Sequence, residues 1–282
     1  VRAALDKVPA LDPTTVEDVI LGTAQPAGRQ GYNIARIVGD LAGMGHVPGV
    51  TVNRYCSSSL QSIRMAAHAI KAGEGDVFVA CGVETVSQFA YGMSDGGADT
   101  HNPLMAAAEA RTAERSQGGA PTWSPFDGGV ADYYLGMGQT AENVAQFKNV
   151  SREDQDEFAA LSQQRATAAL ERGFFEREIT PIDTVDADGN PVTVSRDDGI
   201  RAGTTKEKLA ELKPVFRPDG TVTAGNACPL NDGAAAVIVM SDTRAAELGL
   251  TPLARVISSG VSALDPEIMG LGPVEATRKA LK

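Results

Sequence analysis

The sequence predicts an α/β fold in which helices cover both faces of a mostly buried sheet. Three observations support this class: short apolar runs recur along the chain, they lack polar alternation, and segments of helical periodicity separate them. A strand that is covered on both faces by helices has this continuous apolar pattern. With 282 residues, the chain is long enough to form one or two domains around such a sheet.

The predicted strands are apolar runs of strand length. They comprise residues 18–21, 50–53, 76–81, 234–240 and 253–257. We expect all of them to be buried in one α/β core. No apolar run approaches the ~18 residues of a membrane-spanning helix, so we expect no membrane insertion.

A helix is predicted directly after the second strand. It begins at Ser58 or Ser59 and ends at Ala72, because Gly73 is a typical helix stop. The residues at helical spacing on its apolar face are Leu60, Ile63, Ala67 and Ile70.

The chain changes character between the third and fourth strands. Residues 86–220 are rich in Gly, Asp, Gln and Arg, which indicates a large insertion on the sheet. Within it, Ser151 and Asp154 resemble an N-cap with an acidic first turn, and they predict a helix over residues 153–172. The Asp-Gly-Asn sequence at residues 188–190 predicts a hairpin turn.

The charge excludes two classes of partner. Lys and Arg total 25 and Asp and Glu total 36, which gives a net charge of −11. Nucleic acids and anionic membrane surfaces bind proteins through clustered basic side chains. We therefore expect neither as a partner.

The three cysteines are Cys56, Cys81 and Cys228, an odd number without a C-x-x-C pair. A disulfide framework or a structural zinc site has no support in this pattern, so we expect no metal site and a reducing, cytoplasmic compartment. Cys81 ends a predicted strand, and packing in the core is the expected role of such a thiol.

Cys56 occupies the predicted turn between the strand at residues 50–53 and the helix that follows. Its sulfur would lie near unpaired N–H groups at the positive end of the helix dipole, which favours the thiolate. A thiolate there can attack a carbonyl carbon while a backbone N–H faces the oxygen that gains charge. Two interpretations stay open: an acyl-transfer nucleophile, or a free cysteine packed as a small hydrophobe.

The residues around Cys56 resemble a family signature. The run VNRYCSSSLQSIRMAAHAI, residues 52–70, is similar to the acyl-enzyme signature of thiolases, the acetyl-CoA C-acyltransferases. Further stretches that resemble thiolase motifs follow in the family's order, at residues 81–87, 137–145, 221–241 and 265–273. The resemblance therefore spans essentially the whole chain.

The resemblance implies a layered α/β/α fold of two similar halves with a loop domain inserted in the first. Residues 1–85 and 221–245 would form the N-terminal half, residues 86–220 the inserted loop domain on the CoA side, and residues 246–282 the beginning of the C-terminal half. The family's N-terminal strand and most of its second half are expected to be absent from this sequence.

The resemblance also implies transfer of an acyl group through a thioester on Cys56. Coenzyme A would be a co-substrate, with no tightly bound cofactor. In the degradative direction the reaction is thiolysis of 3-ketoacyl-CoA, and in the synthetic direction it is a Claisen condensation of acetyl-CoA.

Six positions match family residues that contact acyl-CoA. Arg201 corresponds to an arginine near the adenine nucleotide, where a guanidinium suits phosphate and stacks on adenine. Along the pantetheine, Cys228 stands where many members have a hydrogen-bonding serine, and a thiol is a weaker donor. The other expected contacts are Met137, Phe216, Ala224 and Ala227.

A base is also needed, and the family supplies it from a histidine, a second cysteine and an asparagine-held water. The histidines of this chain are His46, His68 and His101, and none fits the family pattern. His68 lies twelve residues along the predicted helix from Cys56, roughly 18 Å away at 1.5 Å per residue, which is outside proton-transfer reach. We therefore expect this chain alone to be an incomplete catalyst.

Two alternatives to the enzyme stay open. One is a non-catalytic thiolase-like protein that binds acyl-CoA or lipid, and the other is a relative of the ketoacyl synthases, which carry paired histidines that this chain does not show. The family usually pairs through the strand beside the nucleophile, so a homodimer or homotetramer is expected for the intact protein.

Overall fold

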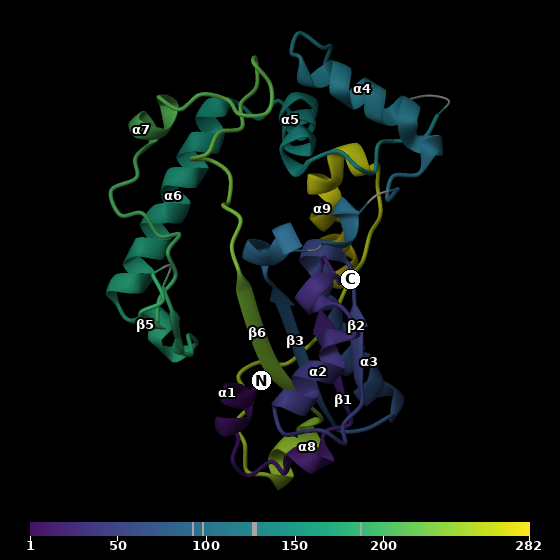
Figure 1. Ribbon diagram of the computed structural model, residues 1–282, viewed down its shortest axis with the longest axis vertical. Coiled ribbons are helices and arrows are strands. Elements are labelled where there is room, and N and C mark those ends of the chain that lie inside the picture. Colours follow the sequence, from purple (N-terminus) through teal and green to yellow (C-terminus); the bar gives the residue numbers. More distant parts are fainter. Residues whose placement is uncertain (92, 98, 126–128, 187) are drawn as a thin grey trace. The chain divides into compact units, whose positions relative to one another are not determined.

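The computed structural model of the chain describes residues 1–91, 93–97, 99–125, 129–186 and 188–282 (Figure 1). The chain divides into two compact units. The first, the sheet unit, comprises Val1–Thr100 and Leu230–Ser259. The second, the helical unit, comprises His101–Pro229 and Gly260–Lys282.

The sheet unit is built on four strands. They are β1 (Asp18–Gly22), β2 (Gly49–Val52), β3 (Val77–Glu84) and β6 (Gly233–Met240). Their order is β2-β1-β3-β6, in which β1 pairs in parallel with both β2 and β3, and β6 runs antiparallel to β3. The parallel strands therefore end at the same edge of the sheet, where βα turns collect.

Helices cover the two faces of this sheet. On one face α1 (Arg2–Asp6) and α2 (Ile34–Leu41) pack around Val19, Leu21 and Val79. On the other face α3 (Ser58–Ala72) covers Ile20, Phe78 and Ala80. A short helix, α8 (Asp242–Glu247), follows β6. The predicted α/β class, with a sheet between helices, is thus confirmed.

Burial of the strands differs from the prediction. β1 and β3 are mostly buried, whereas β2 is half-buried and β6 alternates between exposed and half-buried residues. The reason is their position, because β2 and β6 form the two edges of the sheet in the described part of the chain. Residues 253–257 form no strand, so that prediction is wrong: Leu253 and Ile257 are exposed, and no strand among the described residues pairs with them.

The face that α3 buries agrees with the prediction in part, because Ala67 is buried and Ile63 and Ile70 pack against the core. The helix begins at Ser58 and ends before a left-handed Gly73, as expected. However, Leu60 is 68% exposed. The buried stripe is made of small residues, namely Ser58, Ser62, Ala66 and Ala67. Small side chains allow the helix axis to come close to the sheet.

The helical unit contains five α-helices within its described residues. They are α4 (Ala106–Ser116), α5 (Met137–Lys148), α6 (Arg152–Glu171), α7 (Lys206–Ala210) and α9 (Gly272–Ala280). The predicted capping of α6 is confirmed, because Ser151 and Asp154 form a reciprocal capping box. The predicted hairpin is confirmed as well, with β4 (Ile182–Val185) antiparallel to β5 (Pro191–Val194).

A buried carboxylate links distant segments of the helical unit. Glu267 accepts hydrogen bonds from the indole N–H of Trp123 at 2.8 Å and from the backbone N–H of Asp132 at 3.0 Å. Its backbone carbonyl accepts the side-chain amide of Asn143, on α5, at 2.9 Å. These bonds join the chain after α4, helix α5 and the segment before α9.

Two kinds of feature are absent from the described residues. None of their helices has both the length and the apolar character that crossing a membrane requires. Nor do those residues include a group of three or more metal-ligating side chains.

Candidate active site

Cys56 lies in the turn that connects β2 to α3. β2 ends at Val52, a single 3₁₀ turn spans Tyr55–Ser57, and α3 starts at Ser58. The thiol is exposed, so it is not packed as a small hydrophobe in this structure. Its place immediately before the first turn of a fifteen-residue helix puts it near the positive end of that helix dipole.

The turn depends on an unusual backbone conformation at Tyr55, the residue before Cys56. Its φ is +45°, in the left-handed region that β-carbon sterics disfavour. Two polar groups of its backbone are held locally: Tyr55 N–H donates to the side chain of Asn53 at 2.8 Å, and the Ser58 hydroxyl donates to the Tyr55 carbonyl at 2.6 Å. The side chains around the turn therefore compensate for the strained conformation.

Two glycines in the strands let the start of α3 lie against the sheet. A β-carbon at Gly22 would be 2.4 Å from the carbonyl carbon of Ser58, and one at Gly82 would be 1.9 Å from the hydroxyl oxygen of Ser59. Gly22 and Gly82 are partners in the β1–β3 ladder. The position of the Cys56 turn above the strand ends is therefore set by the absence of side chains at two neighbouring sites.

Glu84, at the end of β3, organises the loop that follows β1. Its carboxylate accepts the backbone N–H of Ala24 at 2.7 Å and that of Gln25 at 3.3 Å. It also accepts the side-chain amide of the buried Gln30 at 2.8 Å. The ends of β1 and β3 are thus fastened to each other beside the Cys56 turn.

The other two cysteines differ in accessibility. Cys81 is buried in β3, which confirms the expected core role, and burial raises the pKa of its thiol to about 11. Cys228 is exposed. Two of the three thiols are therefore open to solvent in this structure.

The residues expected at coenzyme A all lie in the helical unit. Met137 is the first residue of α5 and is 54% exposed. The ring of Phe216 lies against the next residue, where a β-carbon at Gly138 would be 2.2 Å from it. Met137 and Phe216 thus form one partly exposed apolar surface at the start of α5.

The expected pantetheine residues Ala224, Ala227 and Cys228 share one exposed loop. This loop is anchored by Asn226, whose side-chain amide donates to the Asp156 carboxylate on α6 at 3.0 Å. The loop thus has a fixed attachment and a row of small exposed side chains.

The loop that carries Arg201 is also attached to α6. The backbone N–H of Arg201 donates to the side-chain oxygen of Gln163 at 2.8 Å, and the Gln163 amide donates to the Gly199 carbonyl at 3.2 Å. Arg201 itself is exposed. Its guanidinium is thereby available to an anionic ligand.

Cys56 and the expected coenzyme A residues belong to different compact units. The structure thus groups Met137 with Phe216 and places the small residues on one loop, but it does not join either group to Cys56. That all of them serve one site stays a prediction.

The histidines take no part in the Cys56 turn. His68 is exposed on α3, as expected. His101 lies in the helical unit, where its Nδ1 is 2.8 Å from the carboxylate of Glu109 and its ring stacks on Tyr134 at 4.1 Å. No sequence pattern indicated that pairing.

The sequence analysis also missed residues around the turn. Tyr55 donates its hydroxyl to Asp95, and Asp95 accepts the side-chain amide of Gln25. These residues are 30 to 70 positions apart and follow no periodic pattern. For Gly22 and Gly82 a signal did exist, since a glycine inside a strand often marks a close backbone approach.

Comparison with known proteins agrees with the fold. The family described as the thiolase N-terminal domain matches residues 1–243. An acetyl-CoA acetyltransferase of Pseudomonas aeruginosa is 45% identical over 282 residues, which cover 100% of this chain and 68% of that protein. A β-ketoadipyl-CoA thiolase of Acinetobacter baylyi is 42% identical over 287 residues, covering 100% of this chain and 69% of that protein.

A solved structure gives the same result. The crystal structure of the Bacillus anthracis acetyl-CoA acetyltransferase matches with a TM-score of 0.77 and 37% identity, covering 99% of this chain and 67% of that one. Fold and turn define an α/β protein with an exposed cysteine where a parallel strand meets a helix. The chain belongs to the thiolase family.

Proposed function

We propose that this chain is the acyl-accepting part of an acyl-CoA C-acyltransferase, with Cys56 as the nucleophile. The observation that carries the proposal is the exposure of Cys56 at the start of α3, on a turn held in a strained conformation. The thiolase relatives, an acetyl-CoA acetyltransferase among them, support it.

The proposed reaction has two half-reactions in a ping-pong cycle. In Claisen condensation the Cys56 sulfur attacks the carbonyl carbon of one acetyl-CoA, the bond to the coenzyme A sulfur breaks so that CoA leaves, and the α-carbon of a second acetyl-CoA, after losing a proton, takes the acetyl group from Cys56. In thiolysis the sulfur attacks the 3-keto carbon of a 3-ketoacyl-CoA, the bond between C2 and C3 breaks, and acetyl-CoA leaves once C2 has gained a proton. The thiolate of CoA then takes the shortened acyl group from Cys56.

Coenzyme A is proposed as a co-substrate held by the helical unit. Arg201 would contact its phosphates or adenine, because an exposed guanidinium forms paired, charge-assisted hydrogen bonds with phosphate. Met137 and Phe216 would line the pantetheine with apolar surface, and Ala224, Ala227 and Cys228 would border it with small side chains. This assignment extends the CoA-side region expected at residues 86–220 to the loop at residues 221–229, which belongs to the same compact unit.

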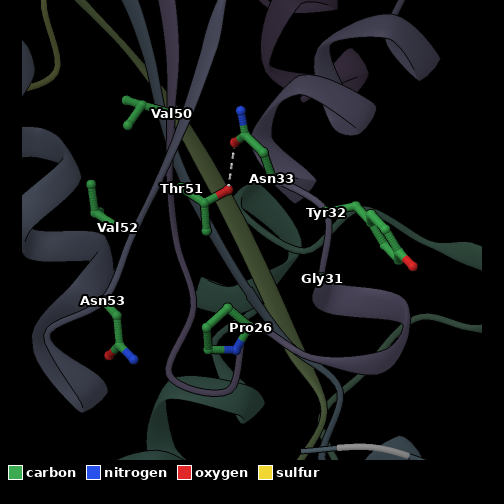
Figure 2. Close-up of a pocket in the computed structure, with 8 residues that line it drawn as sticks. All are labelled: Pro26, Gly31, Tyr32, Asn33, Val50, Thr51, Val52 and Asn53. Carbon is green, nitrogen blue, oxygen red and sulfur yellow. Dashed lines mark hydrogen bonds between the residues drawn. The ribbon is translucent and has the colours of Figure 1, made fainter. Parts of the chain in front are cut away.

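We further propose that the protein assembles through the edge of β2. A groove of about 350 Å³ runs along this strand between Pro26, Tyr32 and Asn53 (Figure 2). The carbonyls of Pro48 and Val52 accept hydrogen bonds from β1 and the residue directly after it. Because successive residues of a strand direct their backbone groups to opposite sides, the N–H and C=O of Thr51 point away from β1, toward the edge. Tyr32 is 97% exposed beside it. A strand of a second copy would satisfy these backbone groups and cover the ring.

The test of the proposed function is acylation of the purified chain by acetyl-CoA. Intact-protein and peptide mass spectrometry should find one acetyl group on Cys56, removable by neutral hydroxylamine. Cys56→Ser should abolish the labile adduct, while the control Cys81→Ala should keep it. An unmodified Cys56 would overturn the nucleophile assignment and favour a non-catalytic thiolase-like binding protein.

A further inference from the structure

We propose that Asp95 and Gln25 are positioning residues for Cys56, acting through the hydroxyl of Tyr55. This inference rests on the proposed function of Cys56 as the acyl acceptor. Tyr55 immediately precedes the cysteine, and its left-handed backbone conformation decides the direction in which the chain enters α3. Groups that hold Tyr55 therefore hold the reactive sulfur.

The contacts form a continuous hydrogen-bonded chain. The Tyr55 hydroxyl donates to an oxygen of Asp95 at 3.1 Å, and the side-chain amide of Gln25 donates to that same oxygen at 2.7 Å. The amide oxygen of Gln25 in turn accepts the backbone N–H of Asp95 at 3.0 Å and the hydroxyl of Ser94 at 2.8 Å. Asp95 is therefore fixed in orientation before it meets Tyr55.

The chain of hydrogen bonds is anchored in the sheet. Gln25 follows β1, and its backbone N–H donates to Glu84 at the end of β3. Tyr55 follows β2. The series Glu84, Gln25, Asp95 and Tyr55 thus connects the carboxyl ends of the three parallel strands, β3, β1 and β2.

The backbone conformation of Tyr55 explains why its hydrogen bond to Asp95 would affect the reactivity of Cys56. A non-glycine residue at positive φ persists only where its surroundings fix it. The backbone of Tyr55 is fixed by Asn53 and Ser58, and its side chain by Asp95. Without the Asp95 contact the residue has one restraint fewer against returning to negative φ, a change that would displace the neighbouring Cys56. A displacement of about 1 Å is enough to slow a reaction strongly.

The experiment measures the acylation rate of Cys56 by acetyl-CoA with rapid quenching and mass spectrometry. In Tyr55→Phe and in Asp95→Ala we expect the rate at saturating acetyl-CoA to fall about tenfold, with the half-saturating concentration unchanged. Asp95→Asn keeps an acceptor for the hydroxyl and should restore most of the rate. Tyr134→Phe, which removes a hydroxyl in the helical unit, is the matched control and should react like the wild type.

The double variant Tyr55→Phe/Asp95→Ala tests whether the two residues act together. If Asp95 acts through Tyr55, the double variant should be no slower than either single variant. Backbone amide exchange of residues 53–59 should rise in all three variants and not in Tyr134→Phe. This readout does not depend on acylation.

The outcomes separate the two proposals. A wild type that is acylated on Cys56, with variants that react at the same rate and exchange alike, overturns the positioning role and leaves the proposed function intact. Multiplicative slowing in the double variant also overturns it. A wild type that is never acylated overturns the proposed function and, with it, the positioning role of Asp95 and Gln25, whatever the amide exchange shows.

Discussion

Gly22 of β1 lies against the backbone of Ser58 at the start of α3, so closely that a β-carbon on the glycine would be 2.4 Å from the Ser58 carbonyl carbon. The contact is with backbone atoms at the start of α3, so Ser58 could move away only if the helix moved with it. Its hydroxyl also donates to the carbonyl of Tyr55. The contact therefore links the packing of the sheet to the geometry of the Cys56 turn.

Gly22→Ala is the first prediction. The added methyl group should push α3 from the sheet and lower the free energy of unfolding by about 2 kcal/mol, the usual cost of overpacking. Chemical denaturation measures this change. Gly233→Ala is the matched control, since no heavy atom lies within 4 Å of a β-carbon there. Equal stability of the two variants would contradict the close approach.

The second prediction concerns the thiols. Cys81 is buried, so reagents in solution do not reach its thiol. Burial also raises the pKa of this thiol to about 11, so it stays protonated at pH 8. Iodoacetamide at pH 8 should therefore modify Cys56 and Cys228, which are exposed, and should reach Cys81 only after unfolding in guanidinium chloride. Peptide mass spectrometry identifies the modified sites. Rapid modification of Cys81 in the folded chain would show that β3 opens.

The sequence predicted those parts of the fold that depend on local signals. The start of α6 follows from its capping box, the β4–β5 hairpin from its Asp-Gly-Asn turn, and β1 and β3 from continuous apolar runs. Residues 253–257 have a similar apolar composition without forming a strand. Composition does not tell whether a neighbouring strand is present, and a strand needs one.

The same limit applies to the candidate site, of which only the part with a local sequence signal was predicted. Cys56 was found because a cysteine between a strand and a helix is a local pattern. The contact between Tyr55 and Asp95 was not, because it joins the side chains of two short 3₁₀ turns that are 40 positions apart in the sequence. Likewise, α3 buries its small residues because glycines in β1 and β3 let the start of the helix come close to the sheet. The sequence of α3 alone carries no information about those glycines.

Asp18, at the start of β1, gives a prediction about pH. Burial raises the pKa of its carboxyl, and its Oδ1 has no hydrogen-bond partner among the described residues. Between the ordinary aspartate pKa of about 3.9 and the raised folded value, the unfolded chain has lost its proton while the folded chain keeps it. The free energy of unfolding therefore falls as the pH rises through this interval. Above the interval, Asp18 causes no further change.

Asp18→Asn removes this titration. The variant should be more stable than the wild type at pH 7, and its advantage should shrink as the pH is lowered toward 4, because the wild-type carboxyl then becomes neutral too. Thermal denaturation across this pH range measures the difference. Asp6→Asn, at an exposed position of α1, is the control. An advantage that grows at low pH would contradict the direction of the Asp18 shift.

Asp156 of α6 gives the last prediction, because it supports the loop expected at the pantetheine. It is 1% exposed and accepts from Arg152 at 2.7 Å and from Asn226 at 3.0 Å. Asp156→Ala leaves a half-buried guanidinium without its carboxylate, so the free energy of unfolding should fall by about 3 kcal/mol. Chemical denaturation measures the loss. The control is Glu153→Ala, at a position one turn before Asp156 on α6. It removes an exposed carboxylate that pairs with Lys206, and the free energy of unfolding should change little, since exposed ion pairs are screened by water. If the two variants were equally stable, the loop would not depend on its attachment to α6, and the proposed pantetheine border at Ala224 and Ala227 would lose its structural basis.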